Sequence, residues 1–274
     1  MTLATEQHEK KEVLARRKAG FWERTEYDRA FRGSFGAYMT AVEADALDRC
    51  FSDGKNAALL DLGCGHGRFL RHFAPRAERL IGLDRSRRLL GVARNWMKDE
   101  PLPVPTELVW ASATEIPLEA GSVDAITCVR VIQHIPDQDA ALAEACRVLA
   151  PDGQFILVQY NWLSPHGMIR ALKIPIKAAL RALLRAMGRE PTFDEPTGWT
   201  FWPSLKAQLE GAGLEVERVT GAWLFPLQYF RSRSSNDAWP LFRSLAYAYE
   251  RLADLPPFRY LGGYLVVRCR PRRP

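Results

Sequence analysis

The sequence predicts an α/β fold, with a seven-stranded, mostly parallel sheet, helices on both faces and further helical segments toward each end of the chain. Two observations predict this class. Short apolar runs alternate with amphipathic helical patterns from about residue 57 to residue 160. Two further strand-like runs lie in the last quarter of the chain, after a stretch that is mainly helical.

Strands are expected where a short apolar run is bounded by charged or turn-forming residues. Runs that are apolar at almost every position suit strands covered on both faces, as in a parallel sheet. The seven expected strands are 57–62, 79–84, 106–111, 123–131, 154–160, 214–220 and 263–269. About forty residues separate the last two strands, where a short hairpin would suffice. This connection is therefore expected to form a lid or a binding surface.

Helices are expected between and around these strands. Ser86 is a suitable N-cap for the helix after the second strand, and Pro151 with Gly153 ends the helix before the fifth. A helix through Phe69 and Phe73 should follow the first strand. The other expected helices are 8–32, 36–51, 86–98, 137–150, 167–187, 201–213 and 237–254.

The composition is ordinary for a globular protein, with 47% hydrophobic and 26% charged residues. No apolar run reaches the length that crosses a membrane. The first twenty residues lack the apolar segment of a secretory signal, so we expect a cytoplasmic protein. The five cysteines form no Cys-x-x-Cys pair and the five histidines lack metal-ligand spacing, so we expect reduced thiols and no metal site.

The loop after the first strand reads Asp-Leu-Gly-Cys-Gly-His-Gly-Arg, from Asp61 to Arg68. It lacks the lysine of a phosphate-binding P-loop, and its Gly-x-Gly-x-Gly spacing differs from the dinucleotide fingerprint Gly-x-Gly-x-x-Gly. Asp61 would repel a pyrophosphate but suits a cationic amino group. Asp84, at the end of the second strand, suits the hydroxyl groups of a ribose. A ligand with a ribose and an ammonium group, such as S-adenosylmethionine, fits both acids.

Four consecutive segments between residues 57 and 160 resemble motifs of the class I S-adenosylmethionine-dependent methyltransferases. The resemblance implies a Rossmann-like fold, S-adenosylmethionine as the cofactor, and one domain spanning 1–274. In that domain, 1–55 would be a helical N-terminal cap, 56–160 the cofactor-binding core, and 161–200 and 221–262 insertions that cover the substrate. The four segments read LLDLGCGHGRF, LIGLDRS, ASATEIPLEAGSVDAITCVRVIQHIPD and EACRVLAPDGQFILVQ.

The resemblance also implies a set of cofactor-binding residues. Asp61 would hold the amino group of the cofactor and Asp84 the ribose. The backbone at Ser112 and Ala113 would meet the adenine, and many relatives have aspartate at the position of Ser112. Two alternatives remain: Gly67 could serve only helix packing, and Asp84 could only begin a turn. Cys64 and Cys128 could act only as small apolar side chains. The implied residues are Asp61, Gly63, Cys64, Gly65, Asp84, Arg85, Ser112, Ala113 and Cys128.

The acceptor of the methyl group is less well defined by the sequence. His134 is the candidate general base, and the alternative is that it stabilises the turn before Pro136. Residues 161–264 hold 16 of the 29 aromatic residues, which suggests an apolar or aromatic acceptor. The Asn-Pro-Pro-Tyr signature of amino-group methylation on bases is absent.

These observations favour transfer to oxygen or carbon of a small, largely apolar metabolite or lipid. One alternative is a nucleic-acid methyltransferase acting on transfer RNA, and another is a non-catalytic cofactor-binding partner of a second enzyme. The sequence does not decide the oligomeric state.

The expected helix at 167–187 belongs to a strongly basic stretch. Six bases and no acid fall between residues 166 and 189, and Pro175 should kink or restart the helix. An ordinary amphipathic helix would pack its apolar side on the domain. Peripheral contact of 167–189 with an anionic membrane is the second interpretation, and RNA binding is a third, less favoured one. The six bases are Arg170, Lys173, Lys177, Arg181, Arg185 and Arg189.

Overall fold

The computed structural model describes residues 20, 23, 34–188, 198–224, 248 and 250–272, without the side chains of residues 34, 35, 170, 173, 176, 177, 181 and 185. Most of the expected helix at 8–32 and most of the expected helix at 237–254 lie outside these residues. Within the described part of the chain, no helix is both long and apolar enough to cross a membrane.

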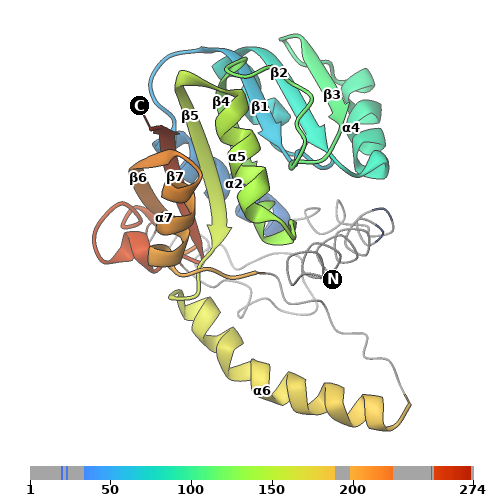
Figure 1. Ribbon diagram of the computed structural model, residues 1–274, viewed down its shortest axis with the longest axis vertical. Helices are drawn as coiled ribbons and strands as arrows, with labels where there is room; N and C mark the ends of the chain where they lie inside the picture. The colour runs from blue at the N-terminus through green and yellow to red at the C-terminus, as the bar shows by residue number, and fades with distance from the viewer. Residues whose placement is uncertain are drawn as a thin grey trace, which may run out of the picture.

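A single seven-stranded sheet forms the centre of the protein (Figure 1). All seven strands predicted from the sequence are confirmed, and each differs from its expected bounds only near its ends, apart from the fifth. The strands are β1 Asn56–Leu62, β2 Ala77–Asp84, β3 Thr106–Trp110, β4 Val123–Val129, β5 Leu149–Tyr160, β6 Leu214–Ala222 and β7 Tyr264–Pro271.

The strand order is β3-β2-β1-β4-β5-β7-β6. The first five strands run parallel to one another, and β7 pairs antiparallel with both β5 and β6. From the central strand β1 the chain passes first to β2 on one side and later to β4 on the other. In open α/β sheets, such a reversal of strand order leaves a crevice at the carboxyl ends of the strands, where ligands bind.

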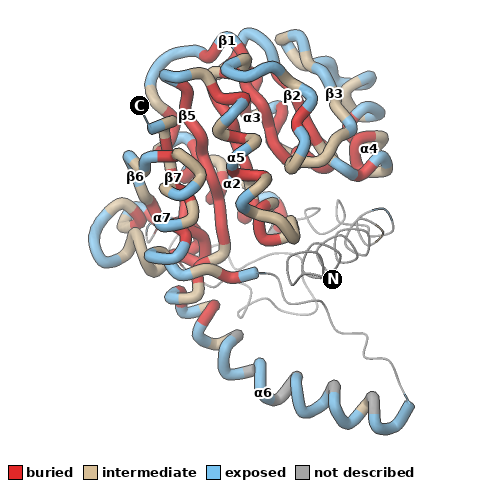
Figure 2. The backbone as a smooth tube through the Cα atoms, in the orientation of Figure 1, coloured by how far each residue is buried: buried red, intermediate tan, exposed pale blue. Residues whose placement is uncertain are grey.

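Helices cover both faces of the sheet, as expected (Figures 1 and 2). Alternate residues of a strand point to opposite faces, so neighbours such as Leu59 and Leu60 belong to different apolar clusters. One cluster joins the sheet to α5 and α7, and the other joins it to α2 and α3. The helices of the core are α2 Ser34–Cys50, α3 Leu70–Phe73, α4 Arg87–Asp99, α5 Gln138–Val148 and α7 Trp202–Gly211.

Two local expectations were wrong in extent. The helix after the glycine loop is only the four-residue α3, because Pro75 opens the 3₁₀ turn Ala74–Arg76 that replaces its continuation. The fifth strand begins earlier than predicted, since Leu149 already pairs with Val123 of β4 before a shift in register. Ser86 is the N-cap of α4 as predicted, and its hydroxyl accepts a hydrogen bond from the backbone N–H of Leu89.

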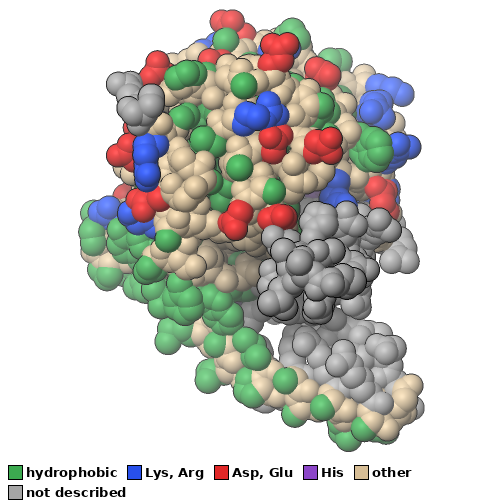
Figure 3. All heavy atoms as spheres, viewed as in Figure 1, with side chains coloured by type: hydrophobic (Ala, Val, Ile, Leu, Met, Phe, Trp, Pro, Cys, Tyr) green, Lys and Arg blue, Asp and Glu red, His purple; other side chains and the backbone are tan. Residues whose placement is uncertain are grey.

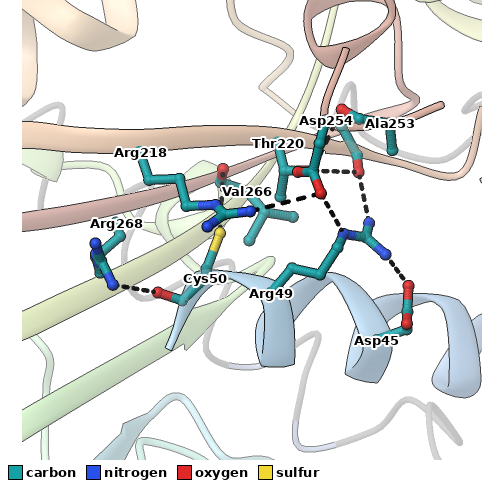
Figure 4. A network of polar contacts seen from close by, with 10 residues as sticks. Asp45, Arg49, Cys50, Arg218, Thr220, Ala253, Asp254, Val266 and Arg268 are labelled. Carbon is teal, nitrogen blue, oxygen red and sulfur yellow. Dashed lines mark hydrogen bonds and ion pairs between the residues drawn. The ribbon is translucent and has the colours of Figure 1, made fainter. Parts of the chain in front are cut away.

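A polar network fastens the end of α2 to the antiparallel edge of the sheet (Figure 4). Asp254 accepts ion pairs from Arg49 of α2 at 3.3 Å and from Arg218 of β6 at 3.5 Å. Arg268 of β7 donates to the carbonyl of Cys50 at 3.2 Å. These contacts hold α2 against the sheet, which matters because α2 also contributes to the site described below.

The basic segment forms one helix, α6 Pro165–Ala186, which runs through Pro175 without interruption. Of the two effects expected at Pro175, a kink or a restart of the helix, the restart is therefore excluded. In Figure 1, α6 follows β5 and extends away from the sheet. In Figure 2, most of α6 has the colour of exposed residues.

Candidate active site

A cleft lies at the carboxyl ends of β1, β2 and β4, where the order of the strands reverses. Its volume is about 970 Å³, part of which is open to solvent. The cleft is therefore in the place that the topology predicts for a ligand. Its lining comes from Asp61, Gly63, Cys64, Gly65, His66, Arg68, Phe69, Leu83, Asp84, Arg85, Leu89, Ala111, Ser112, Ala113, Val129, Arg130, Val131, His134 and Ile135.

Gly63 is required by packing between strands and not only by a ligand. Its φ of +78° lies in the left-handed region, and a Cβ built there would be 2.3 Å from Cγ2 of Val131. Its N–H donates to the carbonyl of Leu83 at 2.7 Å. The absence of a side chain therefore lets the ends of β1 and β4 approach each other closely.

The other two glycines of the loop have different roles. Gly65 lines the cleft, and a Cβ there would meet nothing closer than Leu89 at 3.8 Å, so the backbone is open toward a ligand. Gly67 does not line the cleft, and its Cβ would lie 3.0 Å from Trp96 of α4. The geometry thus supports the alternative in which Gly67 serves helix packing.

Asp61 ends the central strand with a carboxylate that is almost wholly buried, at 3% exposure. The hydroxyl of Thr127 donates to it at 3.0 Å. Burial is the main cause that raises the pKa of Asp61, to about 7, and it outweighs the opposing effects of Thr127 and the Arg68 charge. A buried carboxylate at the edge of a cleft is a suitable partner for a cationic group, which would restore its charge.

Asp84 closes the opposite side of the glycine loop. Its carboxylate accepts hydrogen bonds from the backbone N–H groups of Gly65 and Ser86, both at 2.8 Å. Burial raises the pKa of Asp84. A carboxylate offers about four lone-pair sites, so two remain for the hydroxyl groups of a ligand. The turn beginning at Asp84 and contact with a ligand are therefore compatible roles.

The cysteines near the cleft are not arranged for nucleophilic chemistry. Cys64 lines the cleft, whereas Cys128 is fully buried and Val129 takes its place in the lining. Burial raises the pKa of Cys64 well above its usual value and that of Cys128 to about 12, so both stay protonated. All five cysteines are free, and no group of His, Cys, Asp and Glu among the described residues could hold a metal ion.

Two arginines that the sequence analysis did not single out also line the cleft. Arg68 follows the glycine loop and Arg130 follows β4, and both form ion pairs with Glu43 of α2. The distances are 2.6 Å from Arg68 and 2.9 Å from Arg130, and Glu43 is fully buried. Two arginines therefore share the carboxylate of Glu43 beside the cleft.

Arg130 is held by its backbone as well as by its side chain. Its φ of 59° is in the left-handed region, which is uncommon for a residue with a side chain. Its guanidinium also donates to the phenol oxygen of Tyr264 at 3.4 Å and to that of Tyr160 at 3.5 Å. Backbone strain of this kind concentrates at functional sites, where surrounding contacts maintain it.

His134 ends the 3₁₀ turn Ile132–His134 and lines the cleft. The side-chain amide nitrogen of Gln133 lies 3.3 Å from Nε2 of His134 and donates to the carbonyl of Arg130 at 2.6 Å. The donor and acceptor roles in the contact with the ring depend on the tautomer of His134. Gln133 helps to fix the orientation of the ring.

Comparison with known proteins bears on this arrangement. A family model described as a methyltransferase domain matches residues 60–157, which include both acids and the end of β4. A ubiquinone biosynthesis O-methyltransferase from Bordetella bronchiseptica is 28% identical over 183 residues, which cover 65% of this chain and 70% of that protein. These matches support a class I S-adenosylmethionine-dependent methyltransferase domain over residues 60–157.

Two further comparisons set the extent of the likeness. An uncharacterized 37.1 kDa protein in transposon Tn4556 of Streptomyces fradiae is 39% identical over 125 residues, which span 44% of this chain but about a third, 34%, of that protein. A Thermotoga maritima S-adenosylmethionine-dependent methyltransferase, described as a possible histamine N-methyltransferase, superposes with a TM-score of 0.60. It is 19% identical and covers 92% of this chain and 99% of its own, so it shows the fold alone.

The cleft of the methyltransferase brings together every site residue expected from the sequence except Cys128. The missed residues, Arg68, Arg130 and Glu43, come from segments 25 residues or more apart in the sequence. All three are charged residues that the fold brings close to the end of a strand. In the sequence alone, a single charged residue does not indicate such a position.

Substitution of Gly63 by alanine should destabilise the methyltransferase rather than only weaken binding. The added Cβ would meet Val131, and the left-handed φ would be strained, so we expect a loss of about 2 kcal/mol or more in the free energy of unfolding. Urea unfolding without cofactor measures this loss. Gly121, with a φ of +67° and no atom within 4 Å of its Cβ, is the control for backbone strain alone. Equal losses at the two positions would contradict the clash with Val131.

Asp61 should make the stability of the ligand-free methyltransferase fall as the pH rises. Its pKa is about 7 in the folded state and about 4 in the unfolded chain, so between these values the folded state binds more protons. Above pH 7 the buried carboxylate should lower the free energy of unfolding by a few kcal/mol. We therefore expect the stability of Asp61→Asn relative to wild type to increase from pH 5 to pH 8. Parallel pH profiles in urea unfolding would contradict this assignment.

Proposed function

We propose that the cleft binds S-adenosylmethionine and that the protein transfers its methyl group to oxygen or carbon of a small, largely apolar metabolite or lipid. The observation that carries the proposal is the pair of acids on either side of the glycine loop. Asp61 is buried and accepts a hydrogen bond from the hydroxyl of Thr127, while Asp84 keeps acceptor capacity. A ligand with an ammonium group at one end and ribose hydroxyls at the other satisfies both.

The residues around the loop fit this cofactor. Asp61 would hold the amino group, the open backbone at Gly65 would lie along the amino acid portion, and Asp84 would accept from the ribose. Arg85, Ser112 and Ala113 line the part of the cleft beyond Asp84, where the adenine would lie. S-adenosylmethionine, when bound, supplies a methyl group already activated by its sulfonium.

The remaining work of the protein is to place the acceptor and take its proton. Phe69, Val131 and Ile135 give the other part of the cleft an apolar lining. His134 would remove a proton from a hydroxyl group as the methyl group is transferred. The ubiquinone biosynthesis O-methyltransferases among the relatives support oxygen as the acceptor atom.

Replacement of Asp84 by alanine should weaken S-adenosylmethionine binding by about tenfold or more, because a hydrogen bond to a charged group contributes about 1.5–3 kcal/mol. Isothermal titration calorimetry measures the change. Asp124→Ala is a matched control, since Asp124 also accepts a backbone N–H, that of Ala58 at 2.7 Å, but lies outside the cleft. Unchanged affinity in a folded Asp84→Ala protein would refute the ribose assignment.

Replacement of His134 by alanine should slow methyl transfer by about 10²–10⁴-fold and leave cofactor affinity nearly intact. The variant should also lose the fall in rate that protonation of a histidine causes at acidic pH. His72→Ala is the control, because His72 pairs with Asp48 outside the cleft. Normal turnover by His134→Ala would leave His134 with the turn-stabilising role.

The acceptor itself can be found with labelled cofactor and a fractionated cell extract. Label in an organic-solvent fraction would support a lipid or apolar metabolite. Label that disappears on ribonuclease treatment would instead identify an RNA acceptor. Cofactor binding without labelling of any fraction would favour the non-catalytic alternative.

A further inference from the structure

Helix α6 exposes the apolar residues that an ordinary amphipathic helix would bury. Side chains at four apolar positions of the helix are between 40% and 74% exposed, and Figure 3 shows apolar side chains spaced along the helix. The interpretation in which the apolar side packs against the domain is therefore wrong for Leu172, Leu180 and Leu183. The four positions, which form the apolar row of α6, are Met168, Leu172, Leu180 and Leu183.

The bases of α6 form a second row beside the apolar one. Residues three and four apart share a face of a helix, and the bases follow this spacing along the whole helix. No aspartate or glutamate occurs in α6. The five bases carry a formal charge of +5, close to the +6 of the entire chain. The basic positions are Arg170, Lys173, Lys177, Arg181 and Arg185.

The helix is fixed to the body of the protein at its first turn. Asn161, fully buried, donates to the carbonyls of Tyr260 and Gly262 at 2.7 and 2.9 Å. Ser164 donates to the carbonyl of Asn161 at 2.7 Å and accepts from the N–H of Gly167 at 2.9 Å. A Cβ at Gly167 would lie 2.5 Å from the carbonyl oxygen of Trp162, so the turn also depends on that glycine.

The hydrogen bonds of Asn161 and Ser164 place the start of α6 at the same edge of the sheet as the cleft. The helix follows the carboxyl end of β5, and the cleft lies at the carboxyl ends of the parallel strands β1, β2 and β4. Isolated helices gain most of their stability from packing an apolar face. The start of α6 and the cleft therefore lie at the same edge of the sheet, and the apolar row of α6 is left without the packing that stabilises most helices.

We propose that α6 is an interfacial helix that binds the surface of an anionic lipid bilayer. Its apolar row enters the boundary between headgroups and acyl chains, and its basic row attracts anionic headgroups. Nucleic acid would use the bases but gives no reason for exposed leucine and methionine. A second copy of the chain would bring two basic rows together without acids to balance them.

Co-sedimentation with lipid vesicles tests this inference. The wild-type protein should sediment with vesicles of phosphatidylglycerol and phosphatidylcholine at low salt, remain in solution with phosphatidylcholine alone, and be released at high salt. Failure to sediment with the anionic vesicles would overturn the proposal. The assay requires no methyl transfer, so its result is independent of the proposed function.

Two sets of substitutions separate the contributions of the two rows. Replacing Lys173, Lys177, Arg181 and Arg185 together by glutamine should lower the partition coefficient by about a hundredfold or more. The matched control removes the same charge from exposed bases outside α6, and it should reduce binding much less. That control changes Lys55, Arg79, Arg94 and Lys98 to glutamine.

The double variant Leu172→Gln, Leu183→Gln tests the apolar row. It should lower vesicle binding by about tenfold or more while all charges stay in place. Vesicle binding unchanged by this variant would overturn the interfacial interpretation and leave a purely electrostatic surface, such as one for RNA. A shift from dimer to monomer in sedimentation equilibrium, without vesicle binding by the wild type, would instead identify a second copy as the partner. Thermal unfolding checks that each variant is folded.

Discussion

The close approach of Gly63 to Val131 is the constraint on which the site depends. It lets the ends of β1 and β4 meet while the chain leaves them in different directions. Asp61 lies two residues before this contact, and Arg130 lies one residue before Val131. The same contact thus fixes the buried acid on one side of the cleft and the strained arginine on the other. Any shift in this packing would move Asp61 and Arg130, on the two sides of the cleft, together.

Burial of Asp61 illustrates how stability and binding oppose each other at this site. A carboxylate in that position raises the free energy of the ligand-free protein at neutral pH, since its pKa is raised to about 7. The same burial strengthens its attraction for a cation, because fewer water molecules screen the charge. Glu43 shows the opposite arrangement, in which a fully buried carboxylate is paired with two arginines. The carboxylate of Asp61 is suited to a cationic ligand, whereas that of Glu43 is paired with arginines of the protein itself.

The sequence predicts the parts of this structure that depend on local pattern. Apolar runs identified all seven strands, and the spacing of Asp61, the glycines and Asp84 indicated the cleft, because each residue lies at a strand end. The Glu43 cluster could not be predicted, since it joins three elements through contacts between distant residues. The contact of Gly63 with Val131 could not be predicted either, because Val131 is its neighbour only in three dimensions.

The anchoring of α6 by Asn161 and Ser164 has a consequence for how such a protein can diversify. All of these hydrogen bonds lie before the second turn of the helix, and the described side chains beyond that turn are mostly exposed. Core packing therefore places little restriction on the distal residues of α6. Substitutions among these distal residues would leave the hydrogen bonds of Asn161 and Ser164 intact, and these hydrogen bonds preserve the direction of the helix. The distal part of α6 could therefore change in sequence without loss of the hydrogen bonds that hold the helix to the sheet.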